Sequence, residues 1–205
     1  MRPALCQDAL RLGRVLAALM PEEAETHGLL ALMQIQSSRT AARLDARGRP
    51  VLLLEQDRAQ WDHALIARGL AALERSDALA GARGPYALQA ALAACHARAP
   101  CAADTDWPQI VALYDALAAL TPSPVVELNR AVAVGMAFGP QAALEIVERL
   151  ERDQMLPAYP WLPSVRGDLL HKLGRNDEAR AAFRQAAALT DNAQERELLL
   201  RRAHA

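Results

Sequence analysis

The chain has 205 residues, of which 52% are hydrophobic and 4% aromatic, and its formal net charge is -1. This length suffices for one domain with a sizeable core or for two small ones, and the abundance of Ala and Leu favours helices. The chain has 23 Lys and Arg residues against 24 Asp and Glu, so it has no excess of positive charge to attract a phosphate backbone. The composition therefore argues against direct nucleic-acid binding by this segment.

The cysteines and the first twenty residues indicate a cellular setting. Cys6, Cys95 and Cys101 are an odd number, which predicts free thiols in a reducing cytoplasm and no disulfide framework. Asp8 and Arg11 interrupt the apolar positions near the start, so a signal peptide is not predicted. No run approaches the roughly 18 apolar residues of a membrane span. We therefore expect a cytoplasmic protein without membrane contact.

Helical patterns with clear breaks follow one another along the chain, and strand patterns are nearly absent. A first helix is predicted after Pro3, running to about Met20. A second opens after Pro21 with acidic residues in its first turn, where they complement the helix dipole. Residues 43–50 read as a loop, and residues 51–79 as a short apolar entry into a long helix.

The second half continues the same pattern. Further helices are predicted within residues 85–97, 104–120, 123–139, 140–150, 162–174, 176–190 and 192–205. In the last of these, Asn192 and Glu195 have the spacing of a capping box. The chain is thus expected to contain nine or ten helices joined by short connectors.

Residues 162–192 fit the tetratricopeptide pattern of paired helices. Gly167 takes the small position of the first helix, and Gly174 takes the turn, where glycine permits unusual dihedral angles. The second helix carries the packing residues of the pattern, Ala179, Phe183 and Ala186. The small residues allow the two helices to approach closely, while Phe183 fills the gap to the next repeat.

Weaker copies of this pattern lie upstream. Tyr114 precedes Phe183 by 183 - 114 = 69 residues, about two periods of 34, and Ala131 and Ala143 fall on small positions of a middle unit. We predict an all-α fold with an N-terminal helical portion, residues 1–82. Helical-hairpin repeats follow as a degenerate tetratricopeptide-like superhelix, residues 83–205, in one continuous domain. The inner face of such repeats usually binds a partner.

No local motif predicts catalysis, a cofactor or a metal site. Cys95, His96 and Cys101 come closest to a metal cluster, but neighbouring residues point about 100° apart on a helix and do not converge easily on one ion. No second Cys or His pair lies nearby. The other histidines are scattered, and nucleophile and phosphate-loop motifs are missing. We expect neither an enzyme nor a bound cofactor.

Two stretches have two interpretations each. The helix over residues 85–97 lacks charges and is either buried on several sides or covered only by a docked partner. In "LLEQDRAQWD", residues 53–62, the charges Glu55, Asp57 and Arg58 form either a solvated helix start or an ion-pair network. Trp61 is interpreted as a core anchor in preference to a binding platform.

Four stretches in one order carry a family resemblance. They are "HGLLALMQIQSSRTAARLDARGRPVLLLEQDRAQWD", "RGPYALQAALAACHARA", "DTDWPQIVALYDALAALTPSPVVELNRAVAV" and the closing repeat at residues 162–192. Together they resemble the C-terminal extension of a subfamily of extracytoplasmic-function RNA polymerase sigma factors. That subfamily carries a tetratricopeptide-like helical domain after its DNA-binding portion. The resemblance covers nearly the whole chain, and this chain resembles the extension without the sigma DNA-binding regions.

The resemblance implies a domain that controls a sigma factor through contacts with sigma regions or core RNA polymerase. On that reading, the first candidates for the contact are Gly84, Pro85, Tyr86, Leu88 and Gln89, and the second are Gln56, Asp57, Arg58 and Trp61. One alternative is a general tetratricopeptide-type adaptor for another protein or peptide. Another is a small-molecule sensor or enzyme, which would need a closed pocket with convergent titratable groups.

Overall fold

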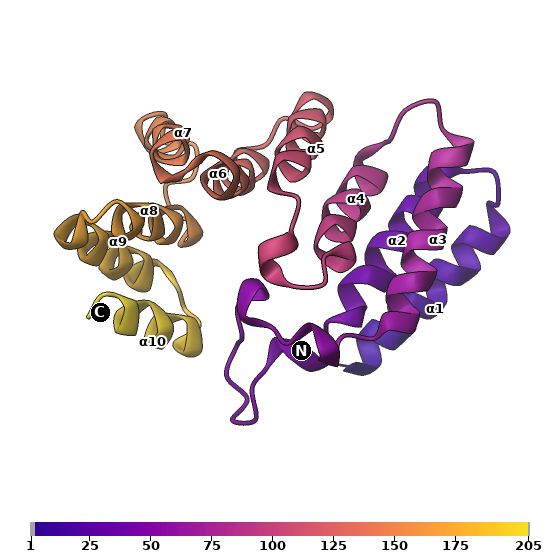
Figure 1. Cartoon of the computed structure of the whole chain (residues 1–205), viewed down its shortest axis with the longest axis horizontal. Coiled ribbons are helices and arrows are strands. Elements are labelled where there is room, and N and C mark those ends of the chain that lie inside the picture. Colours follow the sequence, from indigo (N-terminus) through magenta and orange to yellow (C-terminus); the bar gives the residue numbers. More distant parts are fainter. Residues whose placement is uncertain (1–2, 205) are drawn as a thin grey trace. The chain divides into compact units, whose positions relative to one another are not determined.

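The computed structural model describes residues 3–204, leaving out the side chains of residues 3 and 4. Ten α-helices and four short 3-10 turns follow one another over this range, and an isolated bridge between Leu44 and Pro50 is the only β-type pairing within it (Figure 1). The prediction of an all-α fold is confirmed.

The described chain forms two compact units. The first contains the residues up to 106 together with the short stretch 119–121, and the second contains residues 107–118 and those from 122 onward. The helix that begins at Pro85 therefore groups with the N-terminal helices. The sequence analysis had assigned it to the repeats of residues 83–205.

The first unit is built around one central helix. Its helices are α1 (Pro3–Leu19), α2 (Ala24–Ser38), α3 (His63–Leu79) and α4 (Pro85–Arg98). Helix α2 packs against each of the other three. Glycines permit the closest approaches, because a Cβ on Gly28 would lie 2.8 Å from the backbone nitrogen of Ala87, and one on Gly69 2.6 Å from Cγ1 of Ile35. Side chains at these two positions would push α4 and α3 away from α2.

Residues 39–62 connect α2 to α3 without an α-helix. Three 3-10 turns occur here: η1 (Ala41–Arg43), η2 (Leu53–Glu55) and η3 (Arg58–Gln60). The interpretation of Glu55 to Arg58 as a helix start is wrong, because α3 begins only at His63. The Asp62 carboxylate caps it by accepting a hydrogen bond from the Leu65 backbone at 2.8 Å. Upstream, the Asp57 carboxylate accepts one from the Ala59 backbone at 3.0 Å, which favours a local turn over a helix.

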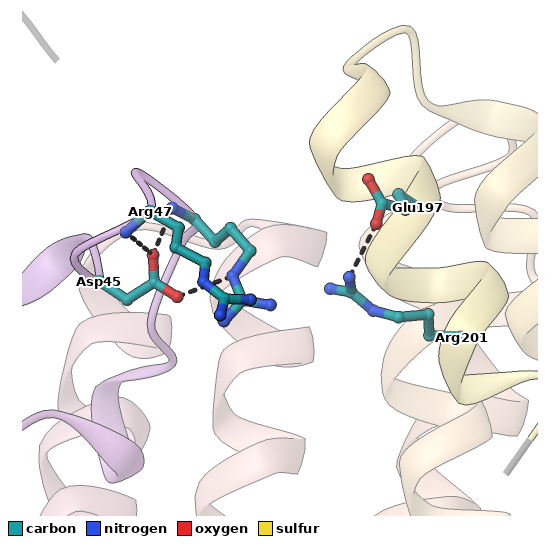
Figure 2. Close-up of polar contacts among 5 residues, drawn as sticks. Asp45, Arg47, Glu197 and Arg201 are labelled. Carbon is teal, nitrogen blue, oxygen red and sulfur yellow. Dashed lines mark hydrogen bonds and ion pairs between the residues drawn. The ribbon is translucent and has the colours of Figure 1, made fainter.

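The predicted loop at residues 43–50 is a tight turn held by one carboxylate. Asp45 accepts hydrogen bonds from the backbone nitrogens of Arg47 at 2.9 Å and Arg49 at 2.8 Å, and from the Arg49 side chain at 2.7 Å (Figure 2). These contacts lower the pKa of Asp45, mainly through the Arg49 backbone bond. Gly48 takes a φ of 73°, which a side chain would disfavour.

The second unit is a run of helices in which neighbours pack in order. It contains α5 (Trp107–Leu120), apart from its last two residues, followed by α6 (Pro124–Phe138), α7 (Pro140–Arg152), α8 (Trp161–Lys172), α9 (Asn176–Leu189) and α10 (Ala193–Arg202). From α6 onward each helix contacts the next one along the chain. This is the arrangement of helical-hairpin repeats, in which each unit buries its apolar face against its neighbours.

The residues that predicted the repeats occupy the expected places. Gly174 takes a φ of 75° in the turn between α8 and α9, and a Cβ on Gly167 would lie 2.8 Å from the Phe183 ring. The other packing residues are all buried, namely Ala131, Ala143, Ala179 and Ala186. The helical-repeat prediction is confirmed.

The predicted cap of α10 is also present. The Asn192 side chain accepts hydrogen bonds from the backbones of Gln194 at 3.0 Å and Glu195 at 3.3 Å. One turn further on, Arg201 donates to Glu197 at 2.8 Å across the exposed side of the helix (Figure 2). Such an exposed pair contributes little to stability.

Candidate protein-interaction site

Helix α4 carries the first group of predicted contact residues, and most of it is core. Its buried side chains are Ala87, Leu88, Ala90, Ala91, Leu92, Ala93 and Ala94. The interpretation of this uncharged helix as one buried on several sides is confirmed. Its small alanines allow the close packing against α2.

The N-terminus of α4 is capped from another helix. The Glu25 carboxylate on α2 accepts hydrogen bonds from the backbone nitrogens of Tyr86 at 2.8 Å and Ala87 at 3.1 Å. Gly84, the N-cap residue, has no side chain to do this, and a Cβ there would collide with Glu25. Pro85 at the first helical position needs no donor partner. The first turn of α4 is therefore fixed to α2 by a carboxylate at the positive end of the helix dipole.

The first group of predicted residues differs widely in exposure. The side chain of Tyr86 is 45% exposed, whereas Leu88 is buried in the core. Gln89 is half-buried and donates to the Pro85 carbonyl at 3.1 Å within its own helix. Pro85 and Tyr86 are thus the exposed residues of this group, and Tyr86 has the larger side chain to offer a partner.

The second group of predicted residues contacts the C-terminal end of α4. Arg58 donates to the carbonyls of His96 at 2.6 Å and of Ala99, and to the hydroxyl of Thr105 at 3.2 Å. Carbonyls at a helix C-terminus have no partner in the helix, so the guanidinium supplies the missing donors. The alternative of an ion-pair network with Glu55 and Asp57 is not what forms, because Arg58 bonds to these carbonyls and this hydroxyl.

Trp61 lies beneath Arg58 in a small core. Its side chain is 3% exposed and clusters with Ala42 and Ile66. The guanidinium carbons of Arg58 and Arg39 lie 5.0 and 5.9 Å from the ring centroid, within cation–π range. The interpretation of Trp61 as a core anchor is confirmed.

Burial, together with nearby positive charges, depresses two pKa values beside this core. Burial, with Arg43 and Arg58 adding repulsion, lowers the pKa of Arg39 to about 10. Burial, with the nearby charges of Arg39 and Arg58, also lowers the pKa of His96 to about 4. His96 is therefore neutral at physiological pH, where protonating it would add a cation to a half-buried cluster of cations.

The two groups do not form one surface. Tyr86 lies in the first turn of α4, and Arg58 binds the last turn at His96. Ten residues of α-helix span about 15 Å. A partner that touches both groups must therefore cover the length of α4.

A groove lies beside the second group. It has a volume of about 540 Å³, and its lining combines apolar residues with exposed polar ones, among them Glu55, Asp57 and Gln60. Of the predicted residues, Asp57 lines it directly, while half-buried Gln56 donates to the Val51 carbonyl at 3.2 Å. Arg58 and Trp61 hold the loop that carries this groove.

A surface on α1 was missed by the sequence analysis. Four leucines of this helix are exposed, between 37% and 75% of their area: Leu5, Leu12, Leu16 and Leu19. At about 100° per residue they fall within an arc of about 60° on one side of the helix. Leu10 and Ala17 are buried on another side. The spacing of the four leucines is visible in the sequence, but a core-facing stripe has the same spacing, so only the structure distinguishes them. We call these four residues the α1 leucine stripe.

Within residues 3–204, no three His, Cys, Asp or Glu side chains are placed to hold a metal ion. Cys101 donates to the Asp104 carboxylate at 3.1 Å, and burial raises the pKa of the Cys95 thiol. No α-helix in the same range is long and apolar enough to cross a membrane.

Comparisons with known proteins matched part of this chain to a family and most of it to a longer relative. Residues 1–77 match a family described as "Family of unknown function (DUF6596)". The chain is also 50% identical over 192 residues to "Uncharacterized protein R00370" of Rhizobium meliloti (strain 1021). That match covers 93% of this chain and 44% of the relative, so the chain spans less than half of the relative's length.

Proposed function

We propose that this chain is a regulatory protein-interaction domain that modulates transcription initiation in the cytoplasm. Its partners are the regions of a sigma factor, core RNA polymerase, or both. The resemblance of four stretches to the extension of a sigma-factor subfamily supports this proposal. The longer relative is consistent with it, because there the matching sequence is part of a larger protein.

The α1 leucine stripe is the observation that carries the interaction role. Exposed leucines that gather on one side of a helix are costly to keep in water and mark a candidate contact with another protein. A helix with one buried side and a second apolar stripe can pack against the apolar face of a partner helix. The stripe lies within residues 1–77, where the family match falls.

Some members of the predicted contact set serve the packing around α4 and are not available to a partner. Leu88 and Trp61 are buried, and Arg58 is engaged by backbone carbonyls. Tyr86 and Asp57 are exposed at opposite ends of α4 and are the members we assign to direct contact. Because Glu25 and Arg58 already fix these two sites, little ordering is needed when a partner binds.

Transcription in vitro tests the proposal. Core polymerase and separately purified sigma regions from the same organism would transcribe a cognate promoter with and without this domain. We expect the added domain to change transcript yield, and the Leu12→Ser, Leu16→Ser double variant to lose most of that effect. Arg11→Ser on the exposed side of the same helix is the matched control and should behave as wild type. An unchanged yield at every domain concentration would contradict the proposal.

A further inference from the structure

Two arginines at the C-terminal end of α2 lie side by side. Arg39 is the C-cap residue of α2, and Arg43 ends the short turn η1. Both guanidinium groups donate to the same oxygen, Oε1 of Gln36, with a distance of 3.1 Å for Arg43. Arg43 also donates to the Gln36 backbone carbonyl at 3.2 Å. A side-chain amide carries no net charge, so Gln36 orients the two cations without neutralising them.

No described carboxylate forms an ion pair with either arginine. Arg39 is half-buried, and the charges that act on its pKa together with burial are the positive charges of Arg43 and Arg58. Asp45 follows Arg43 by two residues, but its carboxylate is engaged by Arg49 at 2.7 Å. Repulsion between like charges is stronger in a half-buried place than in water. An anion that binds between Arg39 and Arg43 would therefore relieve it.

Part of each guanidinium group is open to a ligand. Nε of Arg39 is buried and out of a ligand's reach. Nη1 of Arg39 and both Nε and Nη1 of Arg43 are not among the buried atoms, and they donate to no described residue. Guanidinium nitrogens in this fixed geometry match the oxygens of a phosphate group. Arg58 adds a third positive charge nearby, although its own donors bind carbonyls and Asp104 lies close to it.

We propose that Arg39 and Arg43 form a binding site for a phosphate monoester group. This group is mostly a dianion at neutral pH, so its charge matches that of the two guanidinium groups. Each arginine donates to a different phosphate oxygen, and Gln36 keeps the two side chains together. A carboxylate or a phosphodiester carries one negative charge and compensates only one of the two arginines. The proposal does not rest on the proposed function.

Isothermal titration calorimetry at about pH 7.5 and constant ionic strength tests the proposal. The probes are inorganic phosphate, O-phospho-L-serine and adenosine monophosphate, which present the dianionic group as a free ion, on an amino-acid side chain and on a nucleotide. Acetate and dimethyl phosphate, with one negative charge each, are the comparison compounds. We expect saturable binding of at least one probe and binding at least about tenfold weaker for both comparison compounds. The probe that binds most tightly identifies the source of the group.

A variant and NMR spectroscopy locate the site. Arg43→Gln should weaken binding of the probe about tenfold or more, because it removes one charge and its hydrogen bonds. Arg47→Gln, at an exposed arginine of the neighbouring turn, is the matched control and should bind as wild type. In the wild-type protein, the probe should shift the Nε–H signals of Arg39 and Arg43 and leave that of Arg47 in place.

Arg43 is the arginine to substitute, because the guanidinium of Arg39 also lies over the Trp61 ring. The NMR titration uses the wild-type protein, so it tests the site even if Arg43→Gln fails to fold. No saturable binding of any probe would overturn the proposal. Wild-type affinity in a folded Arg43→Gln variant, equal binding of dimethyl phosphate, or signal shifts confined to other arginines would overturn it as well.

Discussion

A Cβ atom on Gly167 of α8 would lie 2.8 Å from Cε1 of Phe183 on α9. The ring is 3% exposed, so it has little room to move aside. Gly167 thus leaves the space that the ring of Phe183 fills. This contact sets the spacing of the α8–α9 hairpin and explains why the tetratricopeptide pattern requires both residue types.

Gly167→Ala should destabilise the second unit. The added methyl group overpacks a buried contact, and we expect the free energy of unfolding to fall by about 1–3 kcal/mol. Chemical denaturation followed by circular dichroism measures this change. Gly81→Ala is the control, because a Cβ there meets nothing within 4 Å. Equal stability of the two variants would show that the hairpin does not depend on this contact.

Arg58→Ala should destabilise the first unit whether or not a partner is present. The variant loses the hydrogen bonds to the carbonyls of His96 and Ala99 and the stacking over Trp61. We expect a loss of about 2 kcal/mol in the free energy of unfolding. Arg68→Ala, at an exposed arginine on α3, should change it by less than about 0.5 kcal/mol. A fully stable Arg58→Ala protein would argue that Arg58 serves the partner instead.

The neutral state of His96 predicts a pH dependence of stability. Its pKa is about 4 in the folded chain against an ordinary value of 6.5, so between these values the unfolded chain binds the proton and the folded chain does not. The free energy of unfolding should therefore fall as the pH drops from about 7 to 4, by up to about 3 kcal/mol from this group. Below pH 4 the contribution should change no further.

Denaturation curves at several pH values between 7.5 and 4.5 measure this dependence. His96→Gln should flatten the slope, whereas His63→Gln, at the exposed start of α3, should leave it as in the wild type. An unchanged slope in His96→Gln would mean that other groups dominate the acid response.

Glu25→Ala should loosen the first turn of α4. The variant leaves the backbone nitrogens of Tyr86 and Ala87 without their acceptor, and we expect a loss of about 1 kcal/mol. Amide hydrogen exchange of these two residues gives the local readout, with faster exchange expected than in a Glu74→Ala control. Unchanged protection of both amides would show that Glu25 is not the cap.

The helices and repeats could be predicted because their signals are local. Ala179, Phe183 and Gly174 follow a fixed spacing within one hairpin, and each residue type has a single physical reason to be there. The cap at Asn192 was predictable for the same reason. Short-range periodicity is sufficient to define such elements.

The candidate site was less accessible from sequence because its contacts are long-range. Arg58 reaches carbonyls about 40 residues away, and a backbone acceptor leaves no trace in the residue type. The sequence predicts a helix entry at residues 51–62 because an apolar run leads there into charged residues without glycine or proline. The α1 leucine stripe has the spacing of a core face, so its exposure depends on which side α2 covers.

The central claim is that this domain contacts a sigma factor or core polymerase, and an affinity measurement tests it most directly. Biolayer interferometry would compare wild type, Tyr86→Ala and the Leu12→Ser, Leu16→Ser double variant against purified sigma regions and core polymerase. Circular dichroism would confirm that each variant is folded. The account predicts that the wild-type domain binds saturably to the sigma regions, to core polymerase, or to both. It also predicts affinity at least about tenfold weaker in the double variant, because two apolar side chains leave the interface. No binding of the wild-type domain to either component would contradict the claim.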